Sequence, residues 1–295
     1  MMDLRWLRVV VAALSVAGCV SLTADPRAII AGPEGVEVRT LPCDAAIGVA
    51  RKWFPASPSG PALDPARIRM LTWNIHKEDD AGWEADLARF AEANDIVLLQ
   101  EVTLIDPMTE ILRKAGLAWV MASSFIYKDT DIGVVTAARA PTVAHCTQRV
   151  TEPVLRLPKS SVVTWLPVRG SDKLLAVANI HSINFTLTLG AYEAQFAGVI
   201  EALEKHDGPI ILAGDLNTWT DTRVAALQNV AHKLGLTEIP FETGRSRFLG
   251  HELDHILIRG LAVESATAIA VKSSDHNPVT AVLRVTPWGG STALP

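Results

Sequence analysis

The sequence has no surplus of basic residues, little cysteine and no apolar run long enough to cross a bilayer. Its formal net charge of -5 at pH 7 argues against a protein that holds nucleic acid through a general positive field, although it does not exclude hydrolysis of phosphate esters. No internal repeat is visible, so nothing indicates a repeat protein. What remains is a chain of 295 residues, 49% of them hydrophobic, which can bury a large core in one domain or two.

The first residues carry the features of an export signal. Arg5 and Arg8 precede an apolar run over residues 9–17, too short for a transmembrane helix but typical of a signal peptide. The run ends on VAGC, which resembles the bacterial lipobox, in which a Cys after small residues becomes lipidated. We therefore expect residues 1–19 to be a signal peptide with a lipid anchor at Cys19, on the periplasmic side of the cell envelope. The alternatives are an ordinary signal peptide and an uncleaved anchor, and export follows from each.

Composition divides the remaining chain into a linker and a compact domain. Residues 20–67 are rich in Pro and Gly and have little sustained periodicity, which predicts a tether with some local structure between the membrane and the main domain. The domain is expected over residues 68–286, followed by a flexible tail at 287–295. Cys43 and Cys146 remain once Cys19 carries lipid; in an exported protein they either pair or stay as thiols, and the sequence favours neither outcome.

Apolar strands alternate with amphipathic helices in the expected domain. Apolar runs predict strands at 68–75, 95–102 and 209–216, and helical spacing of apolar residues follows Trp83, covers 196–203 and begins again at Val224. Residues 252–260, 261–271 and 277–285 have the alternation of antiparallel strands. This order indicates a mixed α/β fold with helices packed outside β layers.

Polar side chains mark the ends of these strands. The strand PIIL is followed by AGDLN, in which Asp215 and Asn217 lie one residue apart and so leave the strand on the same face. A lone residue of this kind most often caps a turn or is solvated. Six strand ends with such residues, however, predict a shared site, and they carry Asn74, Glu101, His181 with Asn184, Asp215 with Asn217, Asp254, and Asp275 with His276.

The motifs around these residues resemble one known family. In order they are WNI, LLQEV, NIHSIN, GDLN, ELDHIL and SDHNP, and together they resemble the endonuclease/exonuclease/phosphatase superfamily of DNase I-like, Mg-dependent phosphodiesterases. The resemblance covers about residues 68–285, and the stretches EPVLRLPKSSVV and NIHSINF are similar to its bacterial YafD-type branch. It implies a four-layer α/β/β/α sandwich, in which two mixed β-sheets are flanked by helices and one active site lies at the strand ends.

A metal site is expected among these residues. A carboxylate at the end of an apolar strand is costly unless it is paired or metal-bound, which makes Glu101 the first candidate ligand. The resemblance adds Asp275 as a second ligand and Asn74 as a neutral oxygen beside the metal. Oxygen ligands suit a hard divalent cation, so we expect Mg²⁺, with Mn²⁺ as an alternative.

The remaining strand-end residues receive roles in hydrolysis. His276 suits a general base near neutral pH, and the resemblance makes Asp254 the partner that fixes its tautomer. It further implies that Asp215 holds or activates the attacking water and that His181 contacts the phosphate or the leaving group. Asn217 and Asn184 are implied as donors to the phosphate oxygens.

Three hypotheses for the function follow from the sequence. The first is a metal-dependent phosphodiesterase acting on nucleic acid, because nucleases are common in the superfamily. The second is an enzyme acting on a phospholipid or sugar phosphate, which an apolar loop beside the site would favour, just as a basic groove would favour DNA. The third is an inactive, tethered binding module. A monomer is expected under each.

Three neighbouring features are given no catalytic role. His76, Lys77 and Glu78 are expected in a solvated loop, and His255 is expected to pack. Trp73, Trp165 and Trp219 could stack on a base or a lipid but are expected in the core.

Overall fold

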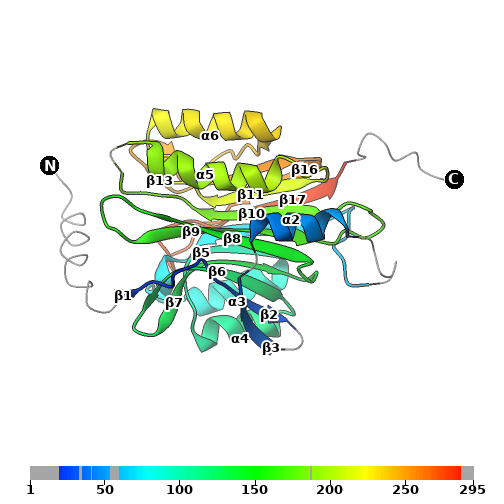
Figure 1. The fold of residues 1–295 in the computed structure, drawn as a ribbon, viewed down its shortest axis with the longest axis horizontal. Coiled ribbons are helices and arrows are strands. Elements are labelled where there is room, and N and C mark those ends of the chain that lie inside the picture. Colours follow the sequence, from blue (N-terminus) through cyan, green and yellow to red (C-terminus); the bar gives the residue numbers. More distant parts are fainter. Residues whose placement is uncertain (1–19, 33–34, 41, 54–59, 187, 287–295) are drawn as a thin grey trace.

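The computed structural model describes residues 20–32, 35–40, 42–53, 60–186 and 188–286. Within them, two β-sheets stack face to face and helices cover both outer faces, so the four layers run α/β/β/α (Figure 1). This is the sandwich that the sequence predicts. The signal peptide with Cys19 and the tail at 287–295 lie outside the described residues.

The first sheet has nine strands among the described residues. Its spatial order is β16 (Leu261–Ala268), β17 (Val279–Val285), β4 (Ile68–Asn74), β5 (Ile96–Thr103), β7 (Thr130–Ala138), β6 (Ala118–Tyr127), β2 (Ala28–Gly32) and β3 (Gly35–Arg39), with β1 (Val20–Ser21) paired to β6. β4 and β5 are parallel, whereas β5, β7 and β6 pair antiparallel in turn.

The second sheet has six strands among the described residues. Its order is β12 (Thr237–Glu238), β15 (Asp254–Arg259), β11 (Ile210–Asp215), β10 (Leu175–His181), β9 (Pro158–Leu166) and β8 (Ala144–Thr151). β10 and β11 are parallel, and the other pairs are antiparallel. A two-stranded hairpin, β13 (Arg247–Phe248) and β14 (His251–Glu252), precedes β15.

Helices cover the outer faces of both sheets. The helices α3 (Trp83–Ala93) and α4 (Asp106–Lys114) pack on the first sheet, and α2 (Cys43–Arg51), α5 (Gly190–Leu203) and α6 (Asp221–Leu234) pack on the second (Figure 1). The continuous apolar runs follow from burial on both faces. In β4, for example, Met70 packs between the sheets while Leu71 and Trp73 pack under the helices.

The predicted strands and helices lie where the periodicity placed them, but their assignment to sheets needed the tertiary structure. β15 pairs with β11 in the second sheet, and β16 pairs with β17 in the first. Gly260, at φ +69°, stands between β15 and β16, a left-handed conformation that suits glycine. The three C-terminal strands are antiparallel to their neighbours, as predicted, but they do not form one meander.

The prediction of a tether over residues 20–67 is wrong for the part that the structure describes. β2 pairs with β6 inside the first sheet, and α2 packs against the second sheet with Ala46 fully buried. Leu63 is also buried and bridges to Val168. The elements are short and Pro and Gly separate them, so no single stretch shows sustained periodicity. Their partners lie up to about a hundred residues away, where sequence periodicity gives no signal.

The choice left open for Cys43 and Cys146 is resolved by a disulfide between them. Their Cα atoms lie 4.9 Å apart and 103 residues apart in sequence. The bond ties α2 to β8, and thus the N-terminal segment to the second sheet. Among the described residues, no helix has both the length and the apolar character to cross a membrane.

The topology brings the carboxyl ends of four strands to one end of the sandwich. β4 and β5 finish there in the first sheet, and β10 and β11 finish there in the second. β15 runs antiparallel to β11, so its first residue, Asp254, lies opposite the last residue of β11, Asp215. The segment before β17 enters the same end, because β17 is antiparallel to β4.

Candidate active site

A cavity of about 470 Å³ opens at this end of the sandwich. Both sheets contribute to its wall. The predicted site residues that line it are Asn74, Glu101, His181, Asn184, Asp215, Asn217, Asp275 and His276. Asp254 lies behind this wall, in contact with His276. The structure therefore brings all nine predicted site residues of the domain to one place.

Close packing of two strands explains the glycine before Asp215. Gly214 has φ +141°, and a Cβ atom on it would lie 2.0 Å from the carbonyl oxygen of Ile180 in the neighbouring strand β10. A residue without a side chain is needed there. Asn217 then adopts φ +47°, and its backbone N–H donates to Asp215 Oδ1 at 3.1 Å. This turn holds Asp215 and Asn217 at the cavity wall.

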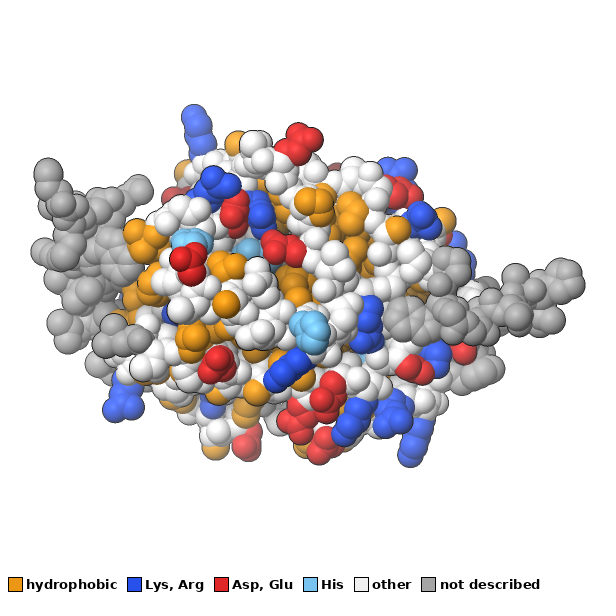
Figure 2. Space-filling view, turned by 90° about the horizontal axis from the view of Figure 1, so that it is seen from above, with side chains coloured by type: hydrophobic (Ala, Val, Ile, Leu, Met, Phe, Trp, Pro, Cys, Tyr) orange, Lys and Arg blue, Asp and Glu red, His pale blue; other side chains and the backbone are white. Residues whose placement is uncertain are grey.

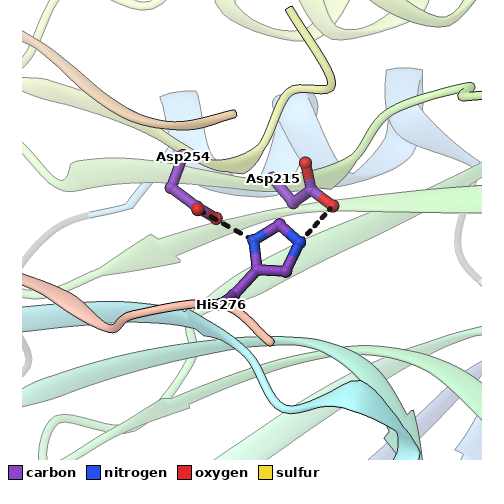
Figure 3. Close-up of side chains that lie close together, drawn as sticks. All are labelled: Asp215, Asp254 and His276. Carbon is purple, nitrogen blue, oxygen red and sulfur yellow. Dashed lines mark hydrogen bonds and ion pairs between the residues drawn. The ribbon is translucent and has the colours of Figure 1, made fainter. Parts of the chain in front are cut away.

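His276 lies between two buried carboxylates (Figure 3). Its Nδ1 lies 2.8 Å from Asp254 Oδ2, and its Nε2 lies 3.9 Å from Asp215 Oδ2. Burial alone would lower the pKa of His276, but the charges of Asp254 and Asp215 outweigh it and raise the pKa to about 10. The arrangement thus stabilises the imidazolium form of His276.

Hydrogen bonds from backbone and side-chain groups fix the positions of His276 and Asp215. Trp73 Nε1 donates to the backbone carbonyl of His276 at 3.0 Å, and the His276 N–H donates to Ser274 Oγ at 3.0 Å. On the other side, Asn74 Nδ2 donates to Asp215 Oδ2 at 3.0 Å. Because β4 holds both Trp73 and Asn74, the first sheet positions a histidine and a carboxylate that come from elsewhere in the chain.

Glu101 points into the cavity from a distorted part of β5. It has φ +54°, and the pairing of β5 with β7 shifts register between Leu99 and Val102. Such a bulge re-aims a side chain at a sheet edge. Lys77 bonds to Glu101 Oε2, and Lys159 Nζ lies 3.6 Å from Glu101 Oε1. Burial would raise the pKa of Glu101, but the two lysines hold it well below its usual range.

His181 lies in the middle of the charged groups. Its Nε2 is 3.5 Å from carboxylate oxygens of both Glu101 and Asp215, and Lys159 Nζ lies 2.9 Å from the same nitrogen. Burial, helped by Lys159, lowers the pKa of His181 to about 4. The ring is therefore neutral at pH 7 and suits a hydrogen bond to a phosphate oxygen better than donation of a proton to a leaving group.

The prediction that His76, Lys77 and Glu78 only form a solvated loop is wrong, although Lys77 is exposed. His76 lines the cavity. The Lys77 ammonium bonds to Glu101, and the Glu78 carboxylate accepts from the backbone N–H of Thr103 at 2.9 Å. All three residues have positive φ, a costly conformation that is retained only where contacts impose it. The only sequence signal was their place two to four residues after Asn74.

The predicted metal ligands all line the cavity but do not form the tightest acidic cluster. Asp275 is mostly exposed, with 62% of its side chain accessible, and lies 4.0 Å from His76 Nδ1. Among the described residues, the cluster whose ligand atoms all lie within 4.8 Å of one another is Asp215, Asp254 and His276. Glu101, Asp275 and Asp215 together line the cavity with carboxylate oxygens, the donor type that hard divalent cations prefer.

The two predicted phosphate-binding asparagines come from loops that one arginine holds together. Arg223 is buried and donates to the carbonyl oxygens of Asn184 at 2.6 Å and Asn217 at 2.8 Å. Its guanidinium also lies 4.4 Å from the ring centroid of Trp219. Asn184 Oδ1 accepts from Trp219 Nε1 at 2.9 Å, which leaves the amide N–H groups of Asn184 as its donors to a ligand.

An aromatic and apolar wall completes the cavity. It consists of Phe185, Trp219, Phe248 and Leu253, and Trp219 and Phe248 meet edge to face at 6.2 Å between ring centroids. Of these, Trp219 was considered in the sequence and expected in the core, which is wrong. Phe185 and Leu253 stand within the motifs NIHSINF and ELDHIL but were given no role there, and Phe248 lies in no motif.

The other aromatic and histidine expectations are confirmed. Trp73 and Trp165 are buried in the core. His255 points away from the cavity, where its Nε2 lies 2.6 Å from Thr218 Oγ1 and its Nδ1 lies 2.7 Å from Glu238 Oε1. It therefore connects β15 to β12 and to the loop after β11 rather than contributing to the site.

Comparison with known proteins places these observations in a family. The model of the endonuclease/exonuclease/phosphatase family matches residues 71–276. A UPF0294 protein of Klebsiella pneumoniae is 36% identical over 243 residues, which cover 82% of this chain and 90% of that protein.

Solved structures share the fold at low sequence identity. The catalytic domain of human Nocturnin, solved with a bound sulfate anion, superposes with a TM-score of 0.59 at 19% identity, covering 76% of this chain and 96% of that one. ANGEL2, a 2',3'-cyclic phosphatase in complex with adenosine-2',3'-vanadate, gives a TM-score of 0.57 at 12% identity, covering 75% and 96%. The chain belongs to the endonuclease/exonuclease/phosphatase family and, within it, to the UPF0294 (YafD-type) proteins.

Proposed function

We propose that the chain is a divalent-metal-dependent phosphodiesterase in which His276 is the general base. The observation that carries this proposal is the position of His276, with Asp254 on one ring nitrogen, Asp215 near the other, and the cavity beside it. A base held by a carboxylate at Nδ1 presents Nε2 to the reacting water.

The donor set supports a hard divalent cation such as Mg²⁺ or Mn²⁺. Glu101 and Asp275 would hold it, with the amide oxygen of Asn74 as a neutral ligand, because all three residues line the cavity. When bound, the cation would supply positive charge at the phosphate and offset the carboxylates that raise the pKa of His276.

The residues around the cavity would take separate roles in hydrolysis. Asp215 would orient a water toward the phosphorus, and His276 Nε2 would accept its proton while Asp254 stabilises the resulting imidazolium. Asn184, Asn217 and neutral His181 would donate hydrogen bonds to the phosphate oxygens. Donors that are fixed before the reaction stabilise the charge that develops in the transition state without reorganising.

Hydrolysis of bis-p-nitrophenyl phosphate tests this proposal. We expect turnover with Mg²⁺ or Mn²⁺ that stops on addition of EDTA, and a loss of about 100-fold or more in kcat for Asp215→Asn, because the water then lacks its orienting carboxylate. Asp207→Asn is the matched control, since Asp207 is exposed and pairs with Lys173 away from the cavity. Turnover that is insensitive to EDTA, or equal in both variants, would contradict the proposal.

Nucleic acid is one candidate substrate of the proposed phosphodiesterase. The aromatic wall of Phe185, Trp219 and Phe248 supports it, because a base could stack there, and ANGEL2, a structural neighbour, was solved with an adenosine derivative. Against it, the basic residues that lie at the cavity already have partners: Lys77 and Lys159 pair with Glu101, and Arg247 pairs with Glu252.

The proposed location is the periplasmic side of the cell envelope, with a lipid anchor at Cys19. The disulfide between Cys43 and Cys146 supports an oxidising compartment. For Cys19→Ser we expect the protein to move from the membrane to the soluble fraction after cell lysis, because the acyl chains supply the membrane affinity. Val49→Ser, an exposed position on α2, is the control. An equal membrane fraction in the two variants would exclude the lipid anchor.

A further inference from the structure

We propose that the end of the sandwich that carries the active site docks on a phospholipid membrane, and that the substrate is the phosphodiester of a membrane phospholipid. This inference rests on the proposed phosphodiesterase function. It is carried by the place where the chain enters the domain and by the exposed apolar side chains around the cavity.

The chain enters the domain at the same end as the active site. Val20 of β1 pairs with Tyr127, the last residue of β6. Both β5 and β6 are antiparallel to β7, so they run parallel to each other. Tyr127 therefore lies at the edge where β5 ends, with Glu101 at the cavity. In Figure 1, β1 lies on the left and β17 points to the right, toward the opposite end.

The entry point projects beyond the sheet edge. Val102 and Ser123 both pair with Gly133, so they lie at the same level. Because β6 carries a bulge after Ser123, Tyr127 pairs with Thr130, three residues beyond Gly133 on β7, which corresponds to about 10 Å of strand. Cys19 comes directly before Val20, so a lipid on Cys19 would be attached at this projecting tip. An uncleaved apolar segment over residues 9–17 would bring the membrane to the same end.

Exposed apolar residues lie at this end on three separate segments. Leu22 is 51% exposed and follows Ser21, which pairs with Ile126. Val154 is 56% exposed in the turn between β8 and β9, and Leu249 is 69% exposed at the tip of the hairpin of β13 and β14. We call Leu22, Val154 and Leu249 the apolar rim. Figure 2 shows exposed hydrophobic side chains among polar ones at the left of the molecule, the side on which β1 lies in Figure 1.

Two parts of the apolar rim, those with Val154 and Leu249, connect to the active site. The turn with Val154 is held beside the phosphate-binding loop, because Glu152 Oε1 accepts from the N–H groups of Asn184 and Phe185, each at 2.8 Å. The hairpin that carries Leu249 also supplies Phe248 to the cavity wall. Insertion of these tips among lipid headgroups would place a phosphodiester at the cavity mouth.

The composition of this end suits a lipid surface better than a nucleic acid. Tyr127 is partly buried, with the Lys128 ammonium 5.1 Å from its ring centroid, and such aromatic and basic pairs are typical of membrane interfaces. Asp129 lies exposed beside Lys128 and Glu252 lies beside Arg247. The charges are therefore mixed, and apolar insertion rather than a positive field would supply the binding energy.

The first experiment compares two triple variants of the full chain, reconstituted in vesicles of phosphatidylethanolamine and phosphatidylglycerol. The rim variant is Leu22→Ser with Val154→Ser and Leu249→Asn, since Asn tolerates the positive φ at position 249. The control replaces the exposed Val36, Val38 and Val263 by Ser, on strands β3 and β16. We expect release of the phospholipid headgroup to fall at least 10-fold in the rim variant only. Hydrolysis of bis-p-nitrophenyl phosphate should stay within twofold in both.

The second experiment measures docking without activity. An environment-sensitive NBD fluorophore is attached at Leu249→Cys and, separately, at Val36→Cys. We expect its emission to rise severalfold on addition of the same vesicles at position 249 and to stay unchanged at position 36. Any labelling at Cys19 gives the same background in both proteins.

The outcomes separate the docking from the reaction. No emission change at position 249, or equal headgroup release by the two triple variants, would overturn the docking. Absence of turnover on every phosphodiester, together with an emission rise at position 249 only, would refute the proposed function while supporting the docking. Rapid cleavage of plasmid DNA with intact vesicle lipid would overturn the phospholipid as substrate in favour of nucleic acid.

Discussion

Replacement of His276 by Gln is expected to lower kcat for phosphodiester hydrolysis about 1000-fold. The variant keeps a polar side chain of similar length between Asp254 and Asp215, but it removes the imidazole. With a bound cation offsetting the two carboxylates, this ring is the group that would accept a proton from the water. The contact that positions the backbone is preserved, because Trp73 donates to the carbonyl oxygen of His276 and not to its ring.

The measurement is steady-state hydrolysis of bis-p-nitrophenyl phosphate at saturating Mg²⁺, with thermal unfolding as the check on folding. Asp254→Asn serves as the graded comparison. It retains the ring but removes the charge that stabilises the imidazolium, so a smaller loss, on the order of 10- to 100-fold, is expected. His255→Gln is the matched control, since His255 points away from the cavity. If His276→Gln kept most of the wild-type kcat, the assignment of the base would be wrong.

Replacement of Glu101 by Gln is expected to weaken binding of a divalent cation at least about 100-fold and to abolish most of the turnover. Glu101 is the carboxylate that β5 directs into the cavity, and an amide is a much poorer ligand for a hard cation. In the metal-free protein the two lysines balance its charge, so the variant also leaves two cations beside the phosphate site.

Titration of Mn²⁺, followed by its paramagnetic resonance signal, measures this affinity without turnover. Lys77→Met gives the opposing comparison. It removes the ammonium that contacts Glu101, so the divalent cation no longer competes with Lys77 for the carboxylate. Binding of Mn²⁺ is therefore expected to be unchanged or tighter. Glu110→Gln, on the exposed face of α4 in contact with Arg113, is the neutral control. Equal Mn²⁺ affinity for Glu101→Gln and wild type would place the metal elsewhere in the cavity, with the cluster of Asp215, Asp254 and His276 as the next candidate.

The strand-end site residues could be predicted from the sequence because their signal is local. A polar residue that closes an apolar run is visible from its neighbours alone, as with Asp215 after PIIL and Glu101 after DIVLL. Strand polarity then places such residues at one edge of a parallel pair, which is why Asn74 meets the β5 end and His181 meets Asp215 in register. The resemblance to a family supplied their roles.

The N-terminal segment was misjudged because its signal is not local. β2, α2 and Leu63 are each too short to give a period, and each is stabilised by a partner far along the chain. The same reason explains why the pairing of Cys43 with Cys146, 103 residues away, could not be chosen from the sequence.

By itself, the sequence determined the alternation of strands and helices, the polar residues at the strand ends, and the apolar runs that require burial on both faces, because each depends on the chemistry of adjacent residues. Tertiary structure alone decided which ends meet. It brought Lys77 onto Glu101, built an aromatic wall from two loops and a hairpin, and placed Val20 at the active-site end. These contacts join residues whose separation along the chain has no fixed relation to their separation in space, so only the pairing of the strands and the stacking of the sheets could set them.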